Sequence, residues 1–150
     1  MSQTTSPPTR TAGFSIKILA MGFVAGFLAV PLGHQIMELI YYLTLPSRKF
    51  PWNMAPNPAS FGLPSVVNLS FWGGVWGVMW ALVEPYAPRG WLYWISAIVF
   101  GGVCATAVGA YVVTALKHLP PGGMSWLGFG VNGAWGLAAA FFLDQMRARF

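Results

Sequence analysis

The stretch ILAMGFVAGFLAVPLGHQIM, residues 18–37, decides the class of this chain because it carries no formal charge. A helix rises about 1.5 Å per residue, so about 20 apolar residues cross the roughly 30 Å hydrocarbon core of a bilayer. We therefore expect a membrane-spanning helix here. Apolar residues continue from about residue 14 to about residue 45, which is too long for one perpendicular span. Pro31 removes a helical hydrogen bond and predicts a bend in this first helix.

Three further apolar stretches follow, at about residues 65–83, 91–116 and 125–143. Of the 150 residues, 56% are hydrophobic and only 7% are charged, against about 25% charged in soluble domains. A soluble fold of this length could not bury so much apolar surface. We predict an all-α membrane protein, a bundle of four transmembrane helices over residues 14–145, between a polar N-terminal tail (1–13) and a basic C-terminal tail (146–150).

The basic residues predict a lipid partner rather than a nucleic acid. The net charge is +5, but the eight Lys and Arg residues are spread along the chain and form no patch. Anionic lipid headgroups attract each such residue near the surface by about 1 kcal/mol. Arg48 and Lys49 lie in residues 46–64, whose many prolines predict a loop. We expect these two side chains to bind lipid headgroups.

The same basic residues predict the orientation of the chain in the bilayer. Four spans place both termini on one side, together with the short link at residues 84–90. The side richer in Lys and Arg normally faces the cytoplasm, so we expect both termini there. The residues compared are Arg10, Lys17, Arg89, Arg147 and Arg149 on the terminal side, and Arg48, Lys49 and Lys117 on the other.

Small residues recur at spacings of four in all four stretches. Such residues lie on one face of a helix, where they let two backbones approach closely and pack. We expect these faces to hold the bundle together, and to dock a second copy of the chain or a larger membrane complex. The expected helix-packing glycines are Gly22, Gly26, Gly73, Gly77, Gly101, Gly109, Gly128 and Gly136.

The best candidate for a functional site is the polar group His34, Gln35, Glu38 and Tyr41. Ionisable groups inside membrane spans are costly and often functional. At about 100° per residue, His34, Glu38 and Tyr41 share a stripe about 60° wide. There an imidazole and a carboxylate could bind a proton or a small polar ligand, or form a hydrogen bond that only holds the bundle together. About 32 Å of helix separates Lys17 from Glu38, which places the pair near the headgroups opposite Lys17.

The chain carries no residue set that predicts an enzyme, a metal centre or a cofactor. Cys104 is the only cysteine, so it forms no internal disulfide and no zinc site built from several cysteines. Haem would need axial ligands such as paired histidines, and His118 lies in the third loop, apart from His34. Asn132 predicts an interhelical hydrogen bond. Interface anchoring and packing explain most of the eight tryptophans more simply than a quinone or pigment pocket.

Three short motifs resemble known sequences. They are GHQ at residues 33–35, PWNMAPNPASFGLP at 51–64 and FWGGVWG at 71–77. Through them, residues 20–140 resemble a group of small bacterial inner-membrane proteins with four predicted transmembrane helices. The resemblance implies a fold and an inner-membrane location, and it implies no activity.

Two functions remain open from the sequence. The first is a structural or accessory membrane protein that packs through its glycine-rich helix faces. The alternative is a small carrier or channel-like protein that moves a proton or a small polar solute through a site at His34 and Glu38. A polar cavity reached by these two side chains would favour the carrier.

Overall fold

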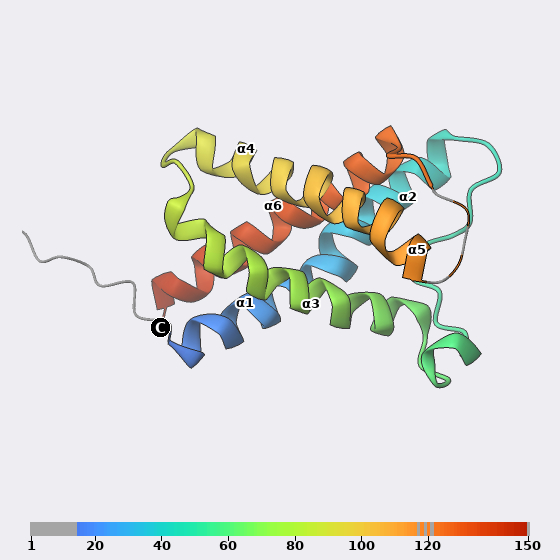
Figure 1. Ribbon diagram of the computed structural model, residues 1–150, viewed down its shortest axis with the longest axis horizontal. Helices are drawn as coiled ribbons and strands as arrows, with labels where there is room; N and C mark the ends of the chain where they lie inside the picture. Colours follow the sequence, from blue (N-terminus) through green and yellow to red (C-terminus); the bar gives the residue numbers. More distant parts are fainter. Residues whose placement is uncertain (1–14, 117, 119, 121, 150) are drawn as a thin grey trace, which may run out of the picture.

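The computed structural model describes residues 15–116, 118, 120 and 122–149, and all regular structure within them is helical. Four long helices run through the molecule (Figure 1). Their bounds are Ile16–Thr44, Ser65–Tyr86, Trp91–Leu116 and Trp126–Arg149, and each is long and apolar enough to span a membrane. The predicted all-α bundle of four transmembrane helices is confirmed, and the chain is a small multi-pass integral membrane protein.

Changes in backbone hydrogen bonding divide the long helices into shorter elements. The first helix comprises α1 (Ile16–Ala29), a π-helical turn (Val30–His34) and α2 (Gln35–Thr44). The second comprises α3 (Ser65–Val83) and a 3₁₀ turn (Glu84–Tyr86). The third comprises α4 (Trp91–Val99), two π-helical segments (Phe100–Ala105 and Val108–Val113) and α5 (Thr114–Leu116). The fourth is α6 (Trp126–Arg149), and one further 3₁₀ turn (Pro58–Ser60) lies in the first loop.

The first helix changes its hydrogen bonding at Pro31, where the sequence predicts a bend. Proline has no N–H to donate to the carbonyl four residues earlier. The chain accommodates this loss with a π-helical turn, in which the Gln35 N–H donates to the Val30 carbonyl. The Pro31 carbonyl accepts a hydrogen bond from the indole Nε1–H of Trp52 at 3.1 Å. A side chain of the first loop therefore holds the bend in place.

Glycines bring two pairs of helices into backbone contact. Between α1 and α3, a Cβ on Gly26 would meet the carbonyl oxygen of Gly73 and would lie 2.7 Å from the Cα of Gly77. Between the third helix and α6, a Cβ on Gly101 would lie 3.1 Å from the Cα of Gly136. Only residues without a side chain allow such close approach. These contacts join the first helix to the second and the third to the fourth.

Two of the expected packing glycines depart from this pattern. Around Gly109, a Cβ would meet no atom of the described residues within 4 Å, so this glycine does not pack as expected. Gly128 faces a side chain instead of a backbone, because a Cβ there would lie 3.1 Å from Cγ2 of Thr106. Spacing alone does not distinguish a glycine that packs from one that borders open space.

The fourth helix extends further than expected. The sequence predicts its end near residue 143 and a basic tail from residue 146, but α6 continues to Arg149. Arg147 in its last turn forms an ion pair with Glu84 at the end of the second helix. Basic side chains also interact favourably with the carboxyl end of a helix. The expected N-terminal tail, residues 1–13, lies outside the described residues.

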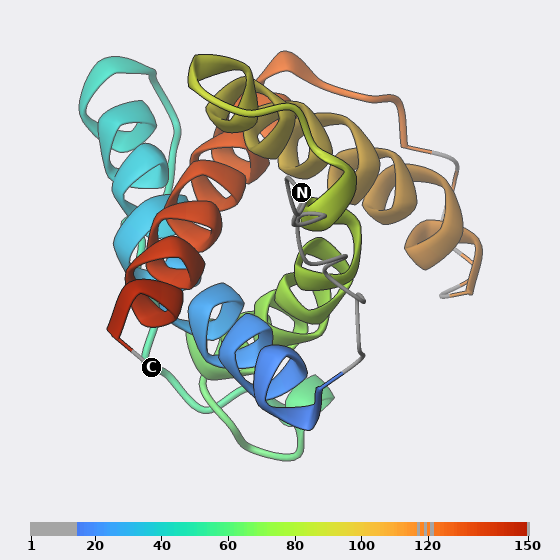
Figure 2. The same cartoon turned by 90° about the vertical axis from the view of Figure 1, so that its left-hand side faces the viewer.

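The two ends of the bundle differ in their connections. The start of α1, the end of α6 and the link after α3 lie at one end, whereas the first loop and the segment before α6 lie at the other, the loop end (Figure 1). From the link, α3 and the third helix diverge toward the loop end (Figure 2). Aromatic rings fill the space nearer the link, where the ring centroids of Trp80 and Phe100 lie 5.3 Å apart.

Candidate functional site

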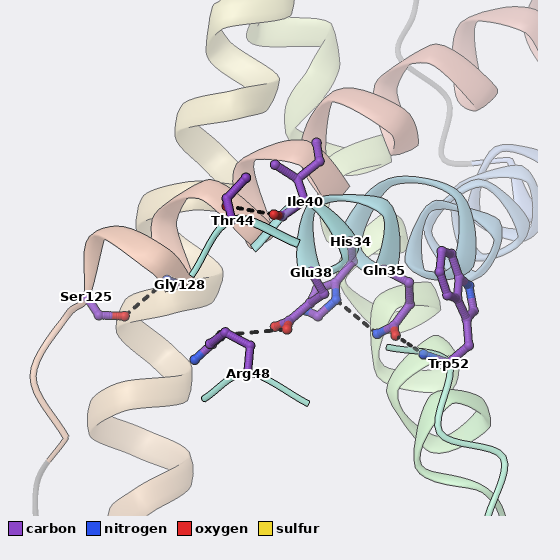
Figure 3. Close-up of polar contacts among 9 residues, drawn as sticks. All are labelled: His34, Gln35, Glu38, Ile40, Thr44, Arg48, Trp52, Ser125 and Gly128. Atoms are coloured by element: carbon purple, nitrogen blue, oxygen red, sulfur yellow. Dashed lines mark hydrogen bonds and ion pairs between the residues drawn. The ribbon is translucent and has the colours of Figure 1, made fainter. Parts of the chain in front are cut away.

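The π-helical turn carries His34, and α2 begins directly after it with Gln35 and Glu38 in its first turn. Gln35 is buried, whereas His34 and Glu38 are half-buried. Figure 3 shows the three side chains close together, with Arg48 of the first loop beside Glu38 and Trp52 beside Gln35. One bent helix and one loop thus assemble the polar group at the loop end of the bundle.

A series of hydrogen bonds determines the tautomer of His34 (Figure 3). The backbone N–H of Trp52 donates to Oε1 of Gln35 at 2.7 Å, so the other terminal atom of Gln35 is its amide nitrogen. This nitrogen lies 3.3 Å from Nδ1 of His34, and an amide nitrogen can only donate. Nδ1 therefore accepts, and the neutral imidazole carries its hydrogen on Nε2. His34 offers an N–H donor at Nε2.

His34 and Glu38 line a cavity of about 270 Å³ at the loop end, which we call the loop-side cavity. Arg48 also lines it, with Nη2 at 3.6 Å from Oε2 of Glu38. The two paired side chains are 32% and 29% exposed, so water reaches the ion pair. The fourth helix and the segment before it complete the wall with Ser125, Leu127, Gly128, Val131 and Asn132.

A second cavity of about 280 Å³ lies deeper in the bundle, and we call it the tryptophan cavity. All four helices contribute to its wall. His34 and Asn132 line both this cavity and the loop-side cavity, so they stand at the boundary between the two. The other wall residues are Val30, Leu69, Trp72, Gly73, Trp76, Ala105, Gly109 and Trp135.

Gln35 and Tyr41, both candidates from the sequence, are not among the described wall residues of either cavity. Gln35 acts on the site only through its hydrogen bond to His34. Tyr41 is 9% exposed, its hydroxyl lies against Gly130, and its ring meets that of Trp126 edge-on at 5.7 Å. Tyr41 therefore packs against α6, and its role as a ligand residue stays a prediction.

The two basic residues expected at the lipid headgroups differ in their surroundings. Arg48 is engaged by Glu38 and lines the loop-side cavity. Lys49 is exposed, as headgroup binding requires. Headgroup binding remains a prediction for both residues, and Arg48 also belongs to the polar site.

Asn132 and Thr106 belong to the site, and reasoning from the sequence did not place them beside His34. Nδ2 of Asn132 donates to Oγ1 of Thr106 at 2.9 Å, which is an interhelical hydrogen bond of the predicted kind. Thr106 is buried in the third helix. The polar amide of Asn132 within an apolar stretch could have indicated a site residue. The sequence does not show which helix such a residue faces.

Comparisons with known proteins identify no relative of this chain, so its possible function is inferred from the geometry of the site. No family model, no curated protein and no solved structure matches the chain. Among the described residues, no group of three or more His, Cys, Asp or Glu side chains is placed to hold a metal ion. The arrangement can bind a small polar group between an imidazole N–H and an amide, beside an ion pair that water reaches.

Replacing Gln35 with leucine is expected to lower the free energy of unfolding by about 1–3 kcal/mol, because it leaves the Trp52 N–H and His34 Nδ1 without their partner. The temperature at which the detergent-solubilised protein loses its near-ultraviolet circular dichroism measures this change. Gln145→Leu is the matched control, since Gln145 is half-exposed on α6 and should change stability by about 0.5 kcal/mol or less. Equal melting of the two variants would contradict the role of Gln35.

Proposed function

We propose that this chain is a small carrier or channel-like protein in which His34 and Glu38 handle a proton or a small polar solute. The observation that carries the proposal is that His34, together with Asn132, lines both cavities. A polar side chain at such a boundary reaches water on one side and the bundle interior on the other. Ionisable groups within membrane spans typically mark pathways of this kind.

The polar residues have different parts in this proposal. Glu38 and Arg48 stand at the mouth, where a partly exposed ion pair is weak enough to open for a solute. His34 donates from Nε2 to an oxygen of that solute. A proton can bind His34 only at Nδ1, because Nε2 already carries a hydrogen. Uptake of a proton therefore requires the hydrogen bond with Gln35 to break.

An accessory role is less well supported, because it requires glycine faces that are free to dock a partner. Gly26 and Gly77 are engaged between α1 and α3. Gly101 and Gly136 are engaged between the third helix and α6. Faces that are occupied within one chain do not dock a second molecule, and of the glycines expected to pack, Gly109 has open surroundings among the described residues. A homo-oligomer or a larger complex would have to form through the remaining lipid-facing surface.

We also propose a location in the bacterial inner membrane, with both termini in the cytoplasm. The resemblance of the three sequence motifs supports the membrane. The excess of Lys and Arg on the terminal side supports the orientation. In this orientation, the loop-side cavity opens toward the periplasm.

Proton flux into liposomes tests the proposal. The protein is reconstituted into liposomes that hold a pH-sensitive dye, and influx is followed after a pH step with potassium and valinomycin to balance charge. We expect influx above that of protein-free liposomes, and a loss of at least about tenfold in His34→Asn and in Glu38→Gln. His118→Asn is the matched control, because His118 is exposed and asparagine tolerates its positive φ of 52°.

The outcomes separate the two candidate functions. Equal proton flux in His34→Asn and His118→Asn would refute a path through His34. If neither protons nor a small neutral solute such as glycerol crossed faster than in protein-free liposomes, the accessory role would be favoured. Copurification in mild detergent would then identify the partner.

A further inference from the structure

The tryptophan cavity is larger than the passage of protons requires. Its volume is about 280 Å³, whereas a cavity of about 150 Å³ already holds a benzene molecule. The indole rings of Trp72, Trp76 and Trp135 contribute to its wall. Packing and interface anchoring, expected of the tryptophans from the sequence, do not account for open space among three of them. Aromatic walls of this kind suit a flat ring.

Exposed wall residues of α3 and of the third helix mark the opening of the cavity, and these two helices diverge toward the loop end (Figure 2). On the α3 side of the opening, Trp72 is 55% exposed and Leu69 is 36% exposed. On the other side, Gly109 of the third helix is exposed. Gly73 and Trp135 form the buried back wall. Leu69 and Trp72 belong to a candidate membrane span, so this side of the cavity is placed to face the acyl chains of the bilayer.

Two polar atoms of wall residues have unused hydrogen-bonding capacity. His34 keeps its Nε2–H as a donor, because Nδ1 accepts from Gln35. Asn132 donates through Nδ2 to Thr106, which leaves its side-chain oxygen as an acceptor. Among the described residues, the side-chain hydrogen bonds found for His34 and Asn132 use Nδ1 and Nδ2 respectively. A hydroxyl group satisfies both, because it accepts and donates at once.

We propose that the tryptophan cavity binds the ring head of a lipid-soluble hydroquinone. The ring lies among the three indoles, one hydroxyl accepts from His34 and donates to Asn132, and the apolar tail leaves between α3 and the third helix. An acyl chain alone would form neither of these hydrogen bonds. This site goes beyond the proposed transport; the two share His34 and are tested by separate measurements.

Titration calorimetry of the protein in lipid nanodiscs tests the site with three ring probes. 2-Naphthol carries one hydroxyl, naphthalene is the same ring system without it, and menadione carries carbonyl oxygens only. Empty nanodiscs correct for partition into lipid. We expect saturable binding of 2-naphthol, and weaker binding of the other two by about tenfold, because each lacks at least one of the two hydrogen bonds.

Gly109→Leu places a large side chain at the opening of the cavity, where a Cβ would meet no described atom within 4 Å. We expect it to weaken 2-naphthol binding by at least about tenfold while leaving helix packing intact. Gly123→Leu is the matched control, because Gly123 has equally open surroundings among the described residues and lies outside the cavity. Asn132→Leu removes the acceptor and keeps the His34 donor, so we expect it to weaken 2-naphthol binding by about tenfold, to an affinity still above that for naphthalene.

Several outcomes would overturn the proposal. These are equal affinities for 2-naphthol and naphthalene, unchanged binding in Gly109→Leu, and no saturable binding above that of empty nanodiscs. Tighter binding of menadione than of 2-naphthol would overturn the assignment of a hydroquinone. Proton flux is measured separately, so a failure of this site and a failure of the proposed transport are distinguishable.

Discussion

Replacing Gly26 with leucine is expected to separate α1 from α3 and to lower the free energy of unfolding by about 3 kcal/mol or more. A Cβ there would meet the carbonyl oxygen of Gly73 and would lie 2.7 Å from the Cα of Gly77. These are backbone atoms, which cannot turn aside as the end of a flexible side chain can. Near-ultraviolet circular dichroism of the detergent-solubilised protein, followed with temperature, reports this loss because it depends on how the tryptophan rings are packed.

Gly109→Leu is the matched control for this experiment. It introduces the same side chain into a membrane span, at a glycine around which a Cβ would meet no described atom within 4 Å. We expect it to melt close to the unchanged protein, whereas Gly26→Leu melts well below it. Equal melting temperatures of the two variants would contradict the close contact of α1 with α3.

The fold could be predicted from the sequence because a bilayer leaves few alternatives. Backbone groups in hydrocarbon must be satisfied within the chain, which restricts a spanning segment of this composition to a helix. The third span, Trp91–Leu116, has the predicted bounds, and α3 ends at Val83 as predicted. The end of α6 was missed because the polar residues beyond residue 143 no longer resemble a membrane span. They remain helical beside the second helix, where Arg147 pairs with Glu84.

The candidate site could be predicted only in part. Helical periodicity shows which residues share one face of a helix, but it does not show which residues of other helices lie opposite that face. Regular spacing places His34, Glu38 and Tyr41 on one side of the first helix, and this side faces α6. Glu38 meets a cavity, whereas Tyr41 packs against Gly130. The surroundings of Glu38 and Tyr41 differ because different residues of α6 lie opposite them. The interhelical hydrogen bond of Asn132 was predicted, but its position beside His34 was not, since that position follows from how two helices pack.

Replacing Trp135 with alanine is expected to lower the free energy of unfolding by about 3–5 kcal/mol. The indole is 3% exposed, and its Nε1–H donates to the carbonyl oxygen of Gly26 at 2.9 Å. A Cβ on Gly73 would lie 3.1 Å from the same Nε1, so the ring of α6 reaches the place where α1 meets α3. Its removal would leave a cavity shared by three helices and a buried carbonyl without its donor.

Two further variants separate the loss of packing from the loss of the hydrogen bond in Trp135→Ala. Their stability is measured by the same thermal melting. Trp135→Phe keeps most of the ring and loses the hydrogen bond to Gly26, so we expect a loss of about 1–3 kcal/mol. Trp72→Ala is the matched control, because Trp72 lines the same cavity but is 55% exposed. It should cost clearly less than Trp135→Ala, since its ring already contacts the surroundings of the protein. Equal losses of stability in Trp135→Ala and Trp72→Ala would contradict a role of Trp135 in joining three helices. The back wall of the tryptophan cavity would then contribute no more to stability than its opening.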